Sequence, residues 1–179
     1  MMRASIYALI VVLLGLPAAV WAQTPIELDF RIGPAIPLGD FSDFAGTGAH
    51  LGGTVLARVS PTVSVGLEMA GNVGHEKGPL ETSIFQLTPV ARVEAPVGGQ
   101  GGFAYLLVGA GYYHTEYELF FLSDSFDDFG INVGAGVLIP LGSGVSAGFD
   151  LRYHHLFETG ADPEYLVPGL LLTYTPGGP

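Results

Sequence analysis

Apolar and polar residues alternate along most of this chain, and a period of two is the pattern of β-strands that present two different faces. The alternation is regular in four segments and less regular in four others. In chain order the eight segments cover residues 26–32, 50–59, 63–69, 83–95, 103–115, 129–137, 145–153 and 165–175. Since no segment shows the 3.6-residue period of an amphipathic helix, the sequence predicts an all-β chain of eight strands.

The first 22 residues have the composition of a secretory signal peptide. Arg3 supplies a positive charge, residues 6–16 are apolar, Pro17 ends that run, and the small residue Ala22 suits peptidase cleavage. The apolar run is shorter than the roughly 20 residues of a transmembrane helix. We therefore predict a signal peptide over residues 1–22, export of the chain, and one domain over residues 23–179.

The connections between the predicted strands alternate in length. Residues 60–62, 97–102 and 141–144 are short turns that contain Gly or Pro. The longer, mostly more polar connections cover residues 34–47, 74–82, 116–128 and 158–164. In a meander every second connection lies at the same end, so tight turns gather at one end and loops at the other. This arrangement predicts an eight-stranded antiparallel up-and-down transmembrane β-barrel.

Alternation alone leaves open which face lies outside, because a soluble lipocalin-like barrel has its apolar face inward. Only 13% of the residues are charged, against about 25% in typical soluble proteins. The single lysine, Lys77, falls in a long connection. Small residues suited to a narrow lumen occupy much of the polar face: Gly52, Gly66, Gly130, Asn132, Gly134, Gly136 and Gly148. We therefore expect the apolar face to contact lipid.

Aromatic residues gather where the strands meet the long connections, as in the interfacial girdle of membrane barrels. The alternative is an ordinary cluster of core aromatics. The residues concerned are Tyr112, Tyr113, Tyr117, Phe120, Phe121, Phe129, Tyr153, Phe157 and Tyr165.

Nine charged residues share the parity of the polar face and should point into the lumen. They are Glu27, Asp29, Arg31, Arg58, Glu68, Arg92, Glu94, Asp150 and Arg152. An isolated charge in a narrow lumen is costly, and the planar fork of arginine pairs well with carboxylates. We predict an Arg–carboxylate network that closes the lumen, with a catalytic carboxylate pair as the alternative.

All twelve remaining acids fall in or beside the long connections, which we expect to be extracellular. The predicted acidic loop residues are Asp40, Asp43, Glu76, Glu116, Glu118, Asp124, Asp127, Asp128, Glu158 and Asp162, with Glu81 and Glu164 beside them. Their charge serves either loop solubility or the binding of divalent cations or a cationic partner. The spacing matches no EF-hand, so it predicts no defined calcium site.

The five histidines, His50, His75, His114, His154 and His155, also fall near the loop end, and we expect them at strand ends that face water. Neighbouring carboxylates leave a zinc site or a general base as alternatives. The chain has no cysteine, which excludes disulfides, Cys-ligated zinc and iron–sulfur clusters. A formal net charge of −11 argues against nucleic-acid binding. We predict no cofactor.

Three short segments carry a family resemblance. Residues 37–41 (Pro-Leu-Gly-Asp-Phe), together with Gly48 and residues 51–52, are similar to a first hairpin of small outer-membrane β-barrel proteins. Residues 60–68 resemble their tight periplasmic turn and outgoing strand, and residues 150–154 resemble their penultimate strand. The group is the OmpA-like and OmpX-like, porin-like barrels. The resemblance covers residues 23–179 and implies a Gram-negative outer-membrane protein that serves as an anchor, adhesin, structural protein or narrow pore.

We therefore predict a monomeric, non-enzymatic protein of the cell outer membrane with a structural or surface-interaction role. Its expected partners are outer-membrane lipids, lipopolysaccharide and the barrel-assembly machinery. The alternatives are a narrow pore for small solutes and a soluble exported barrel that binds an apolar ligand. A hydrolase using His154 or His155 is a further alternative. It is disfavoured because Leu156 and Phe157 stand where lipid A deacylases carry serine, and because Ser123 and Ser125 form no specific pattern.

Two features depart from the family pattern. The family ends on an aromatic residue that the assembly machinery reads, whereas Tyr174 here is followed by Thr-Pro-Gly-Gly-Pro. We expect that Tyr174 takes this role or that assembly differs. Pro89 and Pro168 fall inside predicted strands and predict bulges or local breaks, and Pro34 and Pro37 predict a shortened first strand.

Overall fold

The computed structural model describes residues 25–98, 101–120, 122–157 and 162–177. The predicted signal peptide over residues 1–22 lies outside the described residues. Among those described, no helix combines the length and apolar character needed to cross a membrane. The strands are β1 (Ile26–Leu38), β2 (Gly48–Ser60), β3 (Val63–Lys77), β4 (Leu80–Val97), β5 (Gly102–Leu119), β6 (Leu122–Gly142), β7 (Val145–Leu156) and β8 (Glu164–Tyr174), and a 3-10 helix, η1 (Gly39–Asp43), follows β1.

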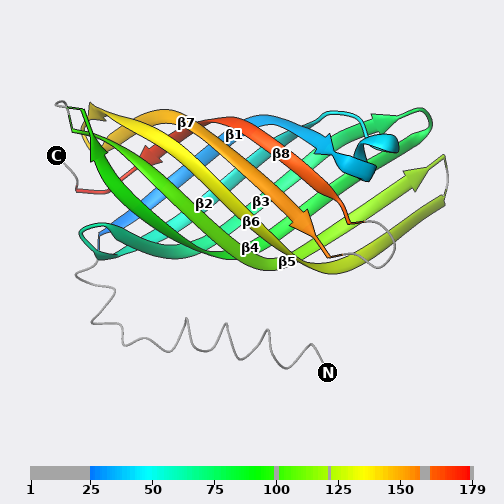
Figure 1. Ribbon diagram of the computed structural model, residues 1–179, viewed down its shortest axis with the longest axis horizontal. Helices are drawn as coiled ribbons and strands as arrows, with labels where there is room; N and C mark the ends of the chain where they lie inside the picture. The colour runs from blue at the N-terminus through cyan, green and yellow to red at the C-terminus, as the bar shows by residue number, and fades with distance from the viewer. Residues whose placement is uncertain (1–24, 99–100, 121, 158–161, 178–179) are drawn as a thin grey trace, which may run out of the picture.

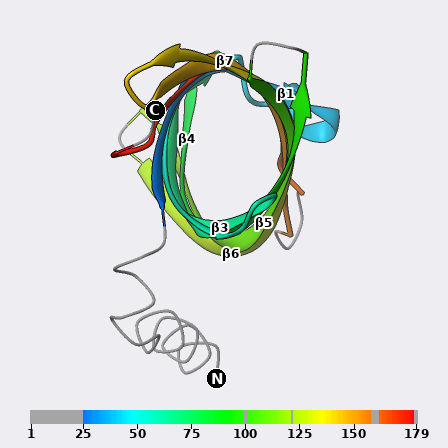
Figure 2. The same ribbon diagram turned by 90° about the vertical axis from the view of Figure 1, so that its left-hand side faces the viewer.

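The strands close into a single antiparallel barrel (Figures 1 and 2). Each strand pairs with its neighbour in the chain, and β1 pairs with β8 through partners such as Leu28 and Tyr174. The start of β1 and the end of β8 therefore lie at the same end of the barrel, together with the tight turns. This architecture confirms the predicted eight-stranded up-and-down barrel.

Two of the predicted long loops are instead continuous hairpins. Lys77 pairs with Leu80, so two residues connect β3 to β4, and Leu119 pairs with Leu122 between β5 and β6. The prediction of loops over residues 74–82 and 116–128 is therefore wrong. Its physical reason is that a strand with water on both sides has polar residues on both faces and resembles a loop in composition. At the end of the barrel opposite the tight turns, the β5–β6 hairpin reaches slightly farther than the other strands (Figure 1).

The prolines interrupt hydrogen bonding without shifting the strands. Pairing of β4 with β5 passes from Leu87 to Val90 and skips Pro89, and the register is the same on both sides of the gap. Pairing of β1 with β8 skips Pro168 in the same way. The predicted local breaks are thus confirmed, because proline cannot donate to the ladder. The predicted shortening of the first strand is wrong, since β1 continues through Pro34 and Pro37 to Leu38.

Alternation separates an apolar outside from a polar inside. On β3, Val65, Leu67 and Met69 are exposed, while Ser64 and Glu68 are fully buried. Large exposed apolar side chains occur on all eight strands. An uninterrupted apolar outer surface of this kind matches the lipid-facing belt of a membrane barrel.

Glycines on the inner face leave room for large polar side chains. A Cβ atom at Gly134 would collide with the side chain of Arg152, and one at Gly136 would collide with the ring of Tyr105. The glycine-rich alternation in β6 thus makes the lumen wide enough for the charged side chains that fill it.

Candidate functional site: the lumen network and the acidic end

The centre of the lumen holds an ion-pair cluster built from β1, β3 and β7. Oε2 of Glu68 accepts hydrogen bonds from Nη2 of Arg31 at 2.8 Å and from Nη1 of Arg152 at 2.7 Å. The carboxylate of Asp150 accepts from Arg31 Nη1 at 2.9 Å and from Arg152 Nε at 3.2 Å. All four side chains are buried. Two acids and two arginines therefore compensate one another where water is excluded.

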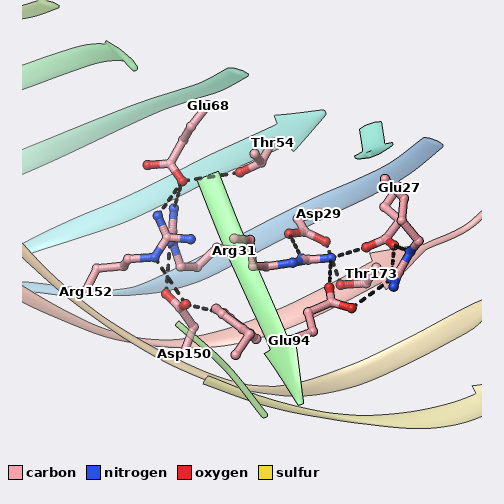
Figure 3. Close-up of polar contacts among 12 residues, drawn as sticks. Glu27, Asp29, Arg31, Thr54, Glu68, Glu94, Asp150, Arg152 and Thr173 are labelled. Carbon is pink, nitrogen blue, oxygen red and sulfur yellow. Dashed lines mark hydrogen bonds and ion pairs between the residues drawn. The ribbon is translucent and has the colours of Figure 1, made fainter. Parts of the chain in front are cut away.

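A second cluster lies nearer the tight turns, and Figure 3 shows both groups. Arg92 is 2.8 Å from Asp29 and 2.6 Å from Glu94. Glu27 lies between Arg92 and Arg58 and pairs with both, and Arg58 is also 2.8 Å from Glu94. The Arg58 side chain is 27% exposed, so this cluster extends from the buried lumen to its tight-turn mouth.

Several of these contacts span the whole width of the barrel. In a ring of eight strands β3 and β7 are diametrically opposite, and so are β4 and β8. The Glu68–Arg152 pair joins the first two strands. The Tyr165 hydroxyl joins the second two by donating to Oε1 of Gln86 at 3.1 Å, and Nε2 of Gln86 donates to Glu68 at 2.6 Å. Bonds across the diameter thus link opposite walls of the barrel at this level of the lumen.

Two histidines belong to this interior. Nε of Arg31 donates to Nε2 of His50 at 3.1 Å, and Nδ1 of His50 donates to Oδ1 of Asn72 at 2.7 Å. The His154 ring stacks on the Tyr165 ring at 4.5 Å. The prediction that His50 and His154 face water is wrong, because both side chains are buried. Strand alternation could have predicted the burial of His154, because it is two residues from Arg152 and therefore lies on the same, inward-facing side of β7.

At the end of the barrel opposite the tight turns, η1 and the residues that follow it pack buried side chains against the barrel, and we call residues 39–47 the lid. Phe41 and Ala45 of the lid are 1% and 3% exposed. The Phe41 ring packs against His75 at 5.6 Å, and the Phe44 ring packs against Tyr117 at 6.4 Å. Hydrophobic periodicity does not predict this element, because a 3-10 turn of five residues is too short to show a period.

Two side chains of β3 hold the lid. Nδ1 of His75 donates to the Gly46 carbonyl at 2.7 Å, and the Lys77 ammonium donates to the Ser42 carbonyl at 2.6 Å. His75 is buried, contrary to the prediction that it faces water. It lies beyond Val73, the last exposed apolar residue of β3. Burial lowers the pKa of His75, and its hydrogen bond to Gly46 opposes that effect.

The described acids predicted for the loops all lie at the lid end, and Glu158 lies outside the described residues. Most are exposed. Glu81 stands opposite Glu76 on one side and Glu118 on the other, so like charges repel across three neighbouring strands. Asp128 is half-buried, and burial together with the nearby Asp127 raises its pKa. Asp40 and Asp43 lie on η1, Glu116 and Glu118 on β5, Asp124, Asp127 and Asp128 on β6, and Asp162 just before β8.

The aromatic girdle is only partly as predicted. Phe129 and Phe157 are exposed and stack with their ring centres 6.2 Å apart. Tyr113 and Tyr165 are fully buried in the lumen, so their assignment to the girdle is wrong. Phe121 lies outside the described residues.

The described residues contain no group of three or more His, Cys, Asp or Glu side chains arranged to hold a metal ion. On the outer face, Nδ1 of His114 is 2.7 Å from Asp127, and Nδ1 of His155 is 3.1 Å from Glu164. Ser125 stands opposite Glu116 rather than opposite a histidine. These contacts assemble no Ser–His–acid site.

Comparisons with known proteins agree with this architecture. Three solved structures show the same fold. Neisserial surface protein A is 11% identical, with a TM-score of 0.66 over 84% of this chain and 96% of that one. The N-terminal β-barrel domain of Pseudomonas aeruginosa OprF is 16% identical, with a TM-score of 0.57 over 86% and 99%. Ail, the attachment invasion locus protein of Yersinia pestis, is 15% identical, with a TM-score of 0.54 over 85% and 97%.

No curated protein matches the sequence. The family model described as outer membrane protein beta-barrel domain matches residues 8–174. The chain therefore belongs to the outer membrane protein β-barrel domain family.

Proposed function

We propose that this protein is a non-enzymatic, monomeric barrel whose lumen is closed and whose function lies in its anionic outer end. The contact that carries the proposal is the Glu68–Arg152 pair, because it joins opposite walls of the barrel within a buried, nearly neutral network. A solute that crossed the lumen at this level would have to separate two buried charges that are hydrogen-bonded to each other, which is unfavourable. This disfavours the narrow pore.

The polar interior also disfavours the soluble barrel that binds an apolar ligand. Such a barrel would keep an apolar cavity inside and a charged surface outside. Here Arg92, Arg152 and Glu68 are buried, whereas Leu106 and Phe149 are 66% and 67% exposed. The exposed belt fits the lipids of an outer membrane, including lipopolysaccharide at the outer leaflet.

The acidic end provides the surface for interaction. The acids there are opposed by a single lysine, Lys77, which is engaged by the lid. The proposed partners are cationic surfaces or divalent cations held by the local potential rather than by a defined ligand set. One structure of Ail is a complex with the heparin analogue sucrose octasulfate. For this chain, whose outer end is acidic, we infer a preference for cationic partners over anionic ones such as heparin.

The proposed orientation places the tight turns in the periplasm and the lid outside, after export through the signal peptide and insertion by the barrel-assembly machinery. Because the chain has no cysteine, single cysteines report accessibility directly. Ser125→Cys lies on the β5–β6 hairpin and Ser143→Cys in the tight turn before β7, and both sites are exposed. In intact cells, a membrane-impermeant maleimide should label the first variant and spare the second. Equal labelling of both, or recovery of the protein from periplasm without detergent, would contradict the proposal.

Column binding tests the proposed preference of the acidic end for cationic partners. The detergent-extracted protein should pass through a heparin column at low salt and be retained on a column of immobilised poly-lysine. Glu116→Gln combined with Glu118→Gln should weaken that retention. The control Asp150→Asn should leave retention unchanged if it folds, because Asp150 is buried in the lumen. Binding to heparin would exclude the anionic-surface role.

A further inference from the structure

One of the two side chains that hold the lid is a histidine whose second ring nitrogen has no partner among the described residues. The His75 side chain is 0% exposed, and Nδ1 donates to the Gly46 carbonyl. Its Nε2 is buried without a hydrogen-bond partner among the described residues. With the proton on Nδ1, Nε2 is an acceptor and the ring is neutral.

Among the residues that the structure describes, no charged group lies close enough to His75 to shift its pKa; burial and the hydrogen bond to Gly46 are the causes of the shift. From η1 the Phe41 ring packs on it, from β8 the Tyr165 ring lies 6.4 Å away, and from β4 Thr82 stands opposite. The remaining charged or titratable groups on the packed elements point elsewhere or lie deeper in the lumen. Glu76 and Glu81 are exposed, as are Asp40 and Asp43 of η1, and the exposed Lys77 donates to the Ser42 carbonyl of the lid rather than facing His75. Glu164 of β8 pairs with His155, and His50 of β2 bonds to Arg31 and Asn72.

A proton added at Nε2 would place an unpaired N–H donor and a charge in this apolar site. Such a group costs free energy unless it gains a partner or reaches water. Burial already lowers the pKa of His75, so the neutral ring is favoured while the lid is closed. The lid is also short: it covers only residues 39–47, and its buried side chains are Phe41 and Ala45. Opening it would hydrate His75 without disturbing the barrel.

We propose that the lid is an acid-released latch, in which protonation of His75 frees residues 39–47 from the mouth of the barrel. The device is independent of the proposed surface role. It changes what the outer end displays, by exposing Phe41 and Ala45, and it leaves the lumen closed, because the Glu68–Arg152 pair lies deeper than the lid.

Single cysteines in the cysteine-free chain test the latch. Ala45→Cys reports the buried side of the lid, and Thr47→Cys, at an exposed position nearby, corrects for the effect of pH on thiol chemistry. The protein is held in detergent micelles and labelled with a maleimide at pH 7.5 and at about pH 5, on either side of the ordinary histidine pKa. The rate at Ala45→Cys relative to Thr47→Cys should rise at least about threefold at the lower pH.

Substitution of His75 tests whether the faster labelling at low pH depends on protonation of this residue. Adding His75→Gln, which stays neutral, should abolish the rise, whereas His114→Gln on the outer face should leave it intact. Should Ala45→Cys fail to fold, chymotrypsin cleavage after Phe41 and Phe44 in the unsubstituted chain gives the same readout, with His75→Gln again the control. Equal relative rates at both pH values, or a rise that persists in His75→Gln, would overturn the latch.

Discussion

The guanidinium of Arg152 on β7 lies 2.7 Å from the carboxylate of Glu68 on β3, directly across the barrel. The same carboxylate oxygen accepts a bond from Arg31 at 2.8 Å. Two arginines on different strands thus depend on one buried acid. This relationship places Glu68 at the centre of the buried network and of the proposed closure of the lumen.

Removal of the Glu68 charge should therefore destabilise the barrel. In Glu68→Gln, Arg31 and Arg152 lose the charge between them, and breaking a buried pair in this way costs about 3–5 kcal/mol. Urea unfolding in detergent micelles, followed by heat-modifiable gel migration, measures the loss. Glu76→Gln, an exposed acid on the same strand, should change the free energy of unfolding by less than about 0.5 kcal/mol. Similar effects of the two substitutions would show that the buried network is not what stabilises the core.

Filling the space beside Arg152 should also destabilise the barrel, in this case by steric collision rather than by loss of a charge. A side chain at Gly134 would collide with Arg152, so Gly134→Val should displace the guanidinium and cost about 1–3 kcal/mol. The matched control is Gly71→Val, because a Cβ at Gly71 meets no atom within 4 Å. The same unfolding assay compares the two. Equal stability of both variants would mean that the inner glycines do not shape the network.

Asp128 gives a pH-dependent prediction at the acidic end. Its pKa is raised in the folded barrel by burial and then by Asp127, so the folded state binds the proton more tightly than the unfolded chain. The charged form therefore destabilises the fold at neutral pH, and that penalty disappears as the pH falls below the ordinary value of 3.8. Asp128→Asn should be more stable than the parent protein at pH 7, with the difference shrinking in acid.

The exposed Asp124 on the same strand provides the comparison for Asp128. Asp124→Asn should show little difference from the parent protein across the same pH series. If the gain from Asp128→Asn grew as the pH fell, the sign of the Asp128 effect would be wrong.

The sequence predicts which residues of this site face the lumen, because inward and outward side chains alternate along each strand. Alternation places Glu68 and Arg152 on the inner face, and the cost of an isolated charge there makes their pairing expected. Which acid meets which arginine depends on the stagger between strands, and Glu68 meets Arg152 only because β3 and β7 are opposite. That choice is a property of the closed ring and cannot be read from either strand alone.

The errors at the loop end have a common cause. His75 and the extended β5–β6 hairpin lie beyond the lipid-facing belt, where the contrast between an apolar and a polar face is lost. Composition then no longer separates strand from loop, and a buried histidine looks like an exposed one. The lid position of Phe41 depends on tertiary contact with His75, which is distant from it in the sequence.

Single-channel recording in planar lipid bilayers tests the closure of the lumen most directly. The unsubstituted protein should insert without producing stable conductance steps. A variant with Arg31, Glu68, Asp150 and Arg152 all replaced by serine serves as the positive control and should conduct if it folds. Large, stable conductance steps from the unsubstituted protein would contradict the account.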